Sequence, residues 1–270
     1  MTLSKVTLTE SEMALLRDCA HVMADAARAA ILPLFRSGLV SDNKDATGFD
    51  PVTEADRNAE KAMRAVLADL RPSDSILGEE FGERDGTSGL QWVLDPIDGT
   101  RGFISGTPTW GVLISVRDVS GPLYGLIDQP YIGERFEGGF GHTVMNGPLG
   151  ARALGTKNTT SLDEATILTT FPEVGMEADA IGFQAVAERC KLTRYGMDCY
   201  GYALLAAGQV DLVVEAGLSA YDIQAPIAVI EAAGGIVTDW RGGPAHEGGR
   251  ALAAANAELH AHAMAILSKH

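Results

Sequence analysis

The stretch Trp92-Val93-Leu94-Asp95-Pro96-Ile97-Asp98-Gly99-Thr100 decides the fold, because an apolar segment in it runs directly into two carboxylates. Carboxylates at the end of a buried strand are costly unless a positive charge meets them. Asp95 and Asp98 flank a predicted turn, whose exposed Ile97 carbonyl could supply a third oxygen ligand. Gly99 and Thr100 are predicted to begin a helix, and the free amides of a helix start suit a phosphate. The stretch could therefore hold both a metal ion and an anion.

Three further segments also place acids at the ends of predicted elements. Glu79 and Glu80 close the apolar strand at 75–78, Asp222 begins an apolar helix, and Asp50 opens the sequence Asp-Pro-Val-Thr. Each has an ordinary explanation when taken alone, as a solvated acid, a helix cap or an Asp-Pro turn. The agreement of all the segments favours the functional interpretation.

Together the segments resemble the signature of the inositol monophosphatase family of Mg²⁺-dependent, lithium-sensitive phosphatases. The matching segments, in the family's order and approximate spacing, are D-P-V-T-E-A-D at 50–56, G-E-E at 78–80, W-V-L-D-P-I-D-G-T at 92–100, Y-D at 221–222 and E-A-A-G-G at 231–235. The resemblance implies an α/β (α+β) fold, namely a layered αβαβα sandwich. Residues 1–148 would form an N-terminal α+β half with the metal motifs, and residues 149–270 a C-terminal α/β half. Members of the family are usually homodimers.

The resemblance also implies a role for each matching residue. It implies two or three Mg²⁺ per site, with Mn²⁺ as a possible replacement, held by Glu79, Asp95, the Ile97 carbonyl, Asp98 and Asp222. The catalytic residues that orient the attacking water and take its proton would be Thr100 and Glu79, with Asp50 nearby. Substrate contacts would come from Gly99, Thr100, Arg101, Asp198, Glu215 and Asp222. Attack would be in line, without a phosphoenzyme.

Other phosphatase chemistries fit the sequence less well. Phosphatases with an aspartyl-phosphate intermediate use Asp-x-Asp-Gly-Thr, whereas two residues separate Asp95 from Asp98. Cysteine phosphatases need Cys-x₅-Arg, but only three residues separate Cys190 from Arg194. The segment 150–157 nearly imitates a P-loop, yet its lysine stands one place late and no Ser or Thr follows it. A non-catalytic, Mg²⁺-responsive phosphate-binding module remains an alternative, although Asp50 and Thr100 would then have no water to activate.

Net charge and cysteine content indicate which partners and which cellular compartment the protein has. The net charge of -15, from 21 basic and 36 acidic residues, repels nucleic acid and anionic membranes at long range. We therefore expect a small phosphorylated metabolite as the partner, reached through bound cations that invert the local field. The three cysteines show no zinc spacing and cannot all pair, which indicates a reducing compartment. Without a signal-like start or a long apolar run, the chain is expected in the cytoplasm.

Hydrophobic periodicity predicts two amphipathic helices, an antiparallel meander and then alternating strands and helices. The first helix covers residues 9–36, and the second begins at Thr53 and turns Ala55, Ala59, Met63, Val66 and Leu70 inward. Short strands at 75–139 predict the meander. After a Gly-rich boundary near 138–150 come strands in ATILTT, LTRYG, VDLVVEAG and GIVTDW, with helices near 177–190, 200–207, from about 222 and near 257–268.

Departures from the inositol-hydrolysing pattern make the sequence similar to the histidinol-phosphatase members. Tyr221 stands where inositol phosphatases typically have Trp, and the segments 101–103, 127–130 and 134–135 also look like the histidinol-phosphate members. Asp198 occupies a position where the inositol enzymes have a small residue, and a carboxylate there favours a cationic substrate. The sequence therefore predicts histidinol-phosphatase activity in histidine biosynthesis, with inositol-1-monophosphatase or a broad small-molecule phosphatase as the alternative.

Overall fold

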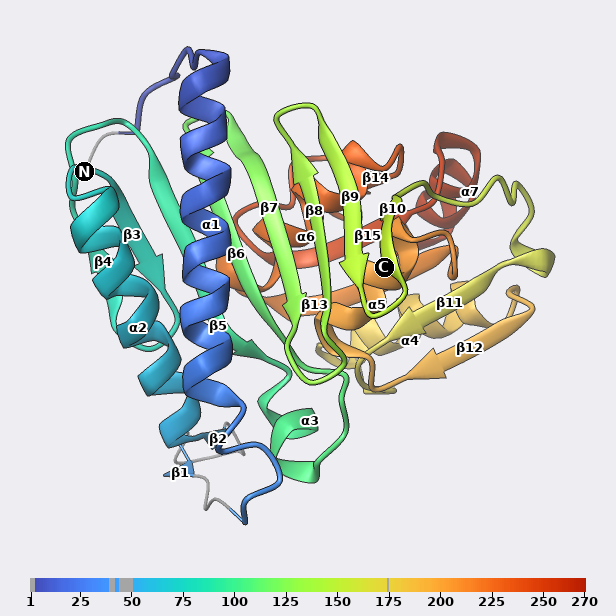
Figure 1. Ribbon diagram of the computed structural model, residues 1–270. Helices are drawn as coiled ribbons and strands as arrows, with labels where there is room; N and C mark the ends of the chain where they lie inside the picture. Colours follow the sequence, from blue (N-terminus) through green and yellow to red (C-terminus); the bar gives the residue numbers. More distant parts are fainter. Residues whose placement is uncertain (1–2, 39–41, 44–50, 174) are drawn as a thin grey trace.

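The computed structural model describes residues 3–38, 42–43, 51–173 and 175–270, in which two sheets and three layers of helices alternate (Figure 1). The helices of the successive layers are α1 (Glu10–Ile31) and α2 (Glu54–Leu70), then α5 (Asp198–Ala206) and α6 (Ala220–Ala232), then α4 (Glu177–Ala187) and α7 (Ala257–Leu267). A hydrophobic core fills each space between layers. The predicted αβαβα sandwich is confirmed.

The first sheet has eight strands in the order β10-β9-β8-β7-β6-β5-β3-β4. They are β3 (Ser75–Gly78), β4 (Gly82–Arg84), β5 (Gln91–Asp98), β6 (Gly111–Asp118), β7 (Gly121–Gln129), β8 (Glu134–Gly139), β9 (His142–Gly147) and β10 (Gly150–Ala153). From β5 to β8 this sheet is the predicted antiparallel meander, and β9 and β10 extend it beyond residue 139, through the stretch predicted as a boundary. The prediction was wrong for β3, which pairs in parallel with β5 because β4 first folds back along its other edge. A separate pair joins β1 (Asp42–Asn43) to β2 (Pro51–Val52).

The first sheet continues beyond residue 148. Strands β9 and β10 form a hairpin, so the division expected between residues 148 and 149 falls in the turn of that hairpin. The sheet itself ends at Ala153, and the division into two halves stays a proposal.

The second sheet has five strands in the order β12-β11-β13-β15-β14. They are β11 (Thr166–Thr169), β12 (Leu192–Tyr195), β13 (Leu212–Leu218), β14 (Ile236–Thr238) and β15 (Gly249–Ala254), and a short 3₁₀ helix, η1 (Leu162–Glu164), precedes β11. The sequence did not predict β15, because its alanines have low strand propensity. This strand is nevertheless buried, and it pairs antiparallel with both β13 and β14.

The two N-terminal helices pack against the first sheet as predicted, with differences at their ends. Thr9 and Thr53 each form a capping box at the start of their helix. Helix α1 ends earlier than predicted, because Pro33 has no amide to continue the hydrogen-bond ladder. In α2, Leu67 is fully buried whereas Leu70 is 48% exposed, so the inward face was predicted wrongly at its last turn.

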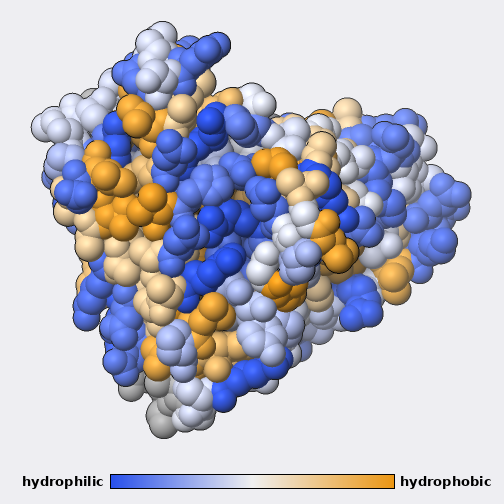
Figure 2. Space-filling model, in the orientation of Figure 1, coloured by the Kyte–Doolittle hydropathy of each residue, from blue (hydrophilic) through white to orange (hydrophobic). Residues whose placement is uncertain are grey.

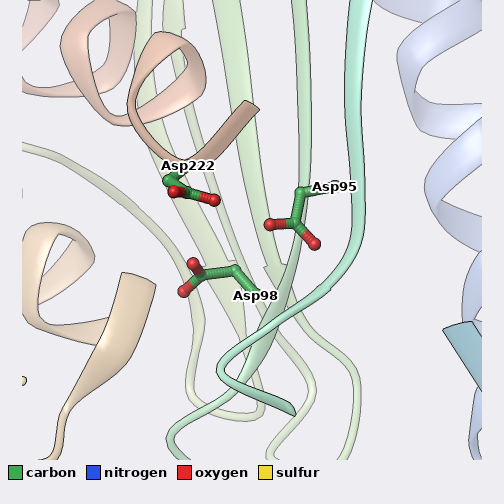
Figure 3. A group of neighbouring side chains, drawn as sticks. All are labelled: Asp95, Asp98 and Asp222. Atoms are coloured by element: carbon green, nitrogen blue, oxygen red, sulfur yellow. The ribbon is translucent and has the colours of Figure 1, made fainter. Parts of the chain in front are cut away.

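Helix α6 lies between the sheets, and its position determines where the active-site residues of its first turn lie. It packs directly against β7 at Gly125, where an added Cβ would come within 2.4 Å of the Ala225 carbonyl oxygen. Only glycine permits this close approach. The first turn of α6 is thereby held next to the end of β5 (Figure 3).

Hydrophilic side chains gather in a hollow in the middle of the face seen in Figure 2. A cavity of about 300 Å³ is lined in part by His21 and Arg28 on α1 and by Arg135 on β8. Arg28 and Arg135 both pair with the buried carboxylate of Asp128, at 2.7 and 2.8 Å. The pair with Arg28 ties α1 to the first sheet, and the pair with Arg135 joins β7 to β8 within that sheet. Among the described residues, none of the helices has the length and apolar character needed to cross a membrane.

Candidate active site

Three carboxylates from two distant segments converge at the boundary between the layers. Asp95 and Asp98 extend from β5, and Asp222 extends from the first turn of α6 (Figure 3). One oxygen from each lies within 4.8 Å of the others. The predicted metal ligands Asp95, Asp98 and Asp222 are thus brought together.

A β-bulge makes this convergence possible. Asp95 pairs with Leu113, but Asp98 pairs with Gly111, so β5 has one more residue than its partner strand. In a regular strand, residues three apart face opposite sides; the extra residue turns both carboxylates the same way. The Asp95 carboxylate also accepts a hydrogen bond from the Ile97 amide, at 3.0 Å. The predicted turn between Asp95 and Asp98 was therefore wrong: both residues belong to β5, and the bulge lies between them.

The electrostatics of the cluster call for a cation. Burial raises the pKa of Asp95 well above its usual range, and the neighbouring charges of Glu79, Asp98 and Asp222 raise it further. The pKa of Asp98 is raised for the same reason, by burial and then by Asp222 and Asp198. Carboxylate oxygens are the ligands that Mg²⁺ prefers, so this donor set fits the expected metal.

Thr100 lies beside a buried acid that the sequence analysis did not select. Its hydroxyl donates toward the Ile97 carbonyl at 3.2 Å and toward the Asp56 carboxylate at 3.4 Å. Asp56 is fully buried, and its other oxygen caps α2 by accepting from the amide and hydroxyl of Thr53. Asp50, the acid that was predicted here, lies outside the described residues. Thr53-x-x-Asp56 could have been recognised as a capping box, but nothing in the sequence indicated the contact with Thr100.

A cavity of about 260 Å³ opens beside the carboxylate cluster. Predicted site residues along its wall are Asp98, Gly99, Thr100, Arg101, Asp198, Glu215 and Asp222. Phe171 and Tyr202, which were not predicted, also border it, and the Arg101 guanidinium lies 4.7 Å from the centre of the Phe171 ring. The cavity therefore brings the predicted substrate residues together with two predicted metal ligands, Asp98 and Asp222, whereas Glu79, Asp95 and Ile97 are not part of its wall.

Asp198 is held in the cavity wall by an unusual backbone conformation. Its φ of 45° is rare for a residue other than glycine, and such strain is concentrated at functional sites. Its carboxylate accepts a hydrogen bond from the Thr109 hydroxyl at 3.1 Å. An added Cβ at Gly99 would come within 2.6 Å of the Asp198 Cγ, so this approach requires glycine. Burial raises the pKa of Asp198, although Thr109 and Arg101 oppose the shift.

Glu215 forms another acidic part of the wall. Burial raises its pKa to about 7, even though hydrogen bonds from Thr170 and Thr169 favour the charged form. These bonds come from the Thr169 hydroxyl and from the amide and hydroxyl of Thr170, at 2.6 to 3.0 Å. A cationic group placed in the cavity would stabilise the ionised form of Glu215.

We predict that Mg²⁺ stabilises the folded protein through this cluster. At a concentration of about 100 times Kd, binding should raise Tm by roughly 5 °C, because the cation removes repulsion that folding imposes on Asp95 and Asp98. Thermal melting with Mg²⁺ and with EDTA measures the shift. Asp95→Asn should abolish most of it, and an equal shift in that variant would show that Mg²⁺ binds elsewhere.

Comparisons with known proteins agree with this geometry. The family model described as "Inositol monophosphatase family" matches residues 12–270. The chain is 41% identical to the bifunctional phosphatase IMPL2 of Arabidopsis thaliana, and the match covers 87% of this chain and 67% of that protein. It is 35% identical to a histidinol-phosphatase of Streptomyces coelicolor, over 93% of this chain and 96% of that protein. A solved inositol monophosphatase from Zymomonas mobilis is 38% identical and superimposes with a TM-score of 0.84, over 97% of this chain and all of that one. The chain therefore belongs to the inositol monophosphatase family of metal-dependent phosphatases.

Proposed function

We propose that this protein is a Mg²⁺-dependent histidinol-phosphatase, which converts L-histidinol phosphate and water into L-histidinol and phosphate. The observation that carries the proposal is the Asp198 carboxylate, which lies in the wall of the cavity that the metal-binding residues Asp98 and Asp222 also line. The similarity to a histidinol-phosphatase over nearly the full length of both chains supports it.

The residues that would hold Mg²⁺ are the carboxylates of Glu79, Asp95, Asp98 and Asp222 and the Ile97 carbonyl. When bound, Mg²⁺ supplies Lewis-acid charge that activates a water and stabilises negative charge on the phosphoryl and leaving oxygens.

The chain's own groups position the water and the phosphate. Asp56 accepts a hydrogen bond from the Thr100 hydroxyl, so the lone pairs of the threonine oxygen can accept a hydrogen bond from the attacking water. As the water attacks, its proton would pass to the threonine oxygen while the threonine proton passes to the Asp56 carboxylate, so that Asp56 is the final base. Glu79 would assist in orienting that water. The amides of Gly99 and Thr100 and the guanidinium of Arg101 would bind phosphate oxygens. Holding water and phosphate in one geometry favours in-line attack.

Charge selects the organic part of the substrate. Histidinol phosphate carries an ammonium and an imidazole, whereas inositol offers only neutral hydroxyls. The Asp198 carboxylate lies in the cavity wall and accepts a hydrogen bond from Thr109, which still leaves oxygen lone pairs for an ammonium. A buried carboxylate favours a cation over a neutral ring.

We expect kcat/KM for histidinol phosphate to exceed that for inositol 1-phosphate. Asp198→Ala should reduce the preference by about tenfold, because one charge-assisted hydrogen bond is lost. Phosphate release from both substrates, by wild type, Asp198→Ala and the isosteric Asp198→Asn, measures it. Equal or reversed specificity in the wild type would refute the histidinol assignment but leave the phosphatase mechanism intact.

Inositol-1-monophosphatase activity is the second candidate, favoured by the 38% identity to the Zymomonas mobilis inositol monophosphatase. The same substrate comparison separates the two activities. A Mg²⁺-responsive binding module would release no phosphate from any ester. Homodimerisation and a cytoplasmic location also stay predictions.

A further inference from the structure

Tyr202 presents a buried hydroxyl to the active-site cavity. The residue lies on α5, is 3% exposed and borders the cavity. Within the described part of the chain, no group forms a hydrogen bond with its hydroxyl oxygen. A buried hydroxyl without a partner is unfavourable, so its presence in a cavity wall indicates that a ligand completes it.

The groups around this hydroxyl restrict what that ligand can be. The charges of Glu215, Asp98 and Asp222 all raise the pKa of Tyr202, which shows that its hydroxyl lies in their common field. Carboxylates accept hydrogen bonds and cannot donate them. Tyr202 thus adds a donor to a wall that is otherwise rich in acceptors. A substrate group with only donors, such as an ammonium, would leave this donor unused.

A neutral imidazole offers both kinds of atom, one N–H donor and one unprotonated nitrogen that accepts. The Glu215 carboxylate accepts three hydrogen bonds from Thr169 and Thr170. A carboxylate has about four acceptor positions, so room for one more donor remains. Glu215 and Tyr202 together therefore offer the acceptor and the donor that the two nitrogens of a neutral imidazole require.

We propose that Tyr202 is a specificity residue that donates a hydrogen bond to the unprotonated ring nitrogen of a neutral imidazole, while Glu215 accepts from the ring N–H. This rests on the proposed histidinol-phosphatase function and deepens it. Asp198 binds the substrate ammonium, and Tyr202 distinguishes the ring from other groups of similar size. In this proposal the Tyr202 hydroxyl contacts the ring of the substrate and not its phosphate.

The test compares two substrates that differ only in the ring. Histidinol phosphate is compared with 2-aminopropyl phosphate, which has the same ester and ammonium but lacks the imidazole. Tyr202→Phe removes the hydroxyl and keeps the ring that packs in α5. It should lower kcat/KM for histidinol phosphate by about 10- to 100-fold and change kcat/KM for 2-aminopropyl phosphate by less than about twofold.

Tyr200→Phe is the matched control. Tyr200 lies two residues earlier on the same helix, and its hydroxyl donates to Glu134 at 2.5 Å, outside the cavity. Its loss should affect both substrates equally. The Tm of both variants checks that Tyr202→Phe weakens recognition of the substrate imidazole and does not destabilise the fold.

The possible outcomes test the role of Tyr202 and the proposed histidinol-phosphatase function separately. Equal losses on both substrates, or no loss on either, would overturn the role of Tyr202 while leaving histidinol-phosphatase activity established. Wild-type protein that hydrolyses inositol 1-phosphate but not histidinol phosphate would overturn the proposed function and the ring contact together.

Discussion

Asp95→Asn and Asp222→Asn are each expected to lower kcat by about three orders of magnitude or more. Each substitution removes one negative charge and one ligand oxygen from the cluster in which all three carboxylates lie within 4.8 Å. The lost charge weakens metal binding, so the charge on the phosphoryl group in the transition state is less well stabilised. Steady-state phosphate release over a range of Mg²⁺ concentrations measures the effect, since excess Mg²⁺ should restore only part of the rate.

Asp69→Asn is a suitable control, because Asp69 lies exposed in the last turn of α2. It changes the net charge equally but should keep wild-type kcat. The metal-free Asp95→Asn protein should fold normally, because removing a like charge relieves repulsion in the cluster. Wild-type turnover in either ligand variant would show that the metal site lies elsewhere.

The site was largely predictable where function depends on one continuous segment. The stretch at 92–100 places carboxylates immediately after apolar residues, and this conflict with burial was visible in the sequence. Asp222 and Glu215 could be assigned only through the family resemblance, because nothing local links them to β5. The layered fold, too, was predicted from the family resemblance.

The remaining features depend on tertiary contacts. The bulge between Asp95 and Asp98 arises from pairing with β6, and alternation along a single strand cannot reveal it. Strand β15 is a strand because β13 and β14 flank it, despite its alanines. Tyr202 appeared as one apolar residue of a helix, and only the structure shows its hydroxyl at the cavity.

Asp56 shows most clearly how one residue can serve both fold and chemistry. As an acid three residues after Thr53, it satisfies the start of α2. The same carboxylate lies next to Thr100 because the start of α2 meets the start of α3 (Thr100–Ser105), whose first residue follows the bulge.

Thr100→Ala and Asp56→Asn are each expected to lower kcat by about two orders of magnitude or more, with a much smaller change in KM. Both act on the attacking water and not on bound substrate, because the Thr100 hydroxyl connects the Asp56 carboxylate to the site. Since the two residues act as a unit, the double variant should lose little more activity than either single one. Thr100→Ser, which keeps the hydroxyl, should retain most of kcat.

The capping role of Asp56 requires its own control. Glu12 holds the equivalent position in α1, where it accepts from the amide and hydroxyl of Thr9, far from the cavity in sequence and absent from its wall. Glu12→Gln should leave kcat unchanged and should reduce Tm by less than Asp56→Asn does, because Glu12 is exposed whereas Asp56 is fully buried. Asp50→Asn completes the comparison, because the two acids of the motif are candidates for the same task. If Asp50→Asn loses kcat while Asp56→Asn keeps the wild-type value, Asp50 and not Asp56 orients the water. If Thr100→Ala keeps the wild-type kcat, the threonine hydroxyl takes no part in the reaction.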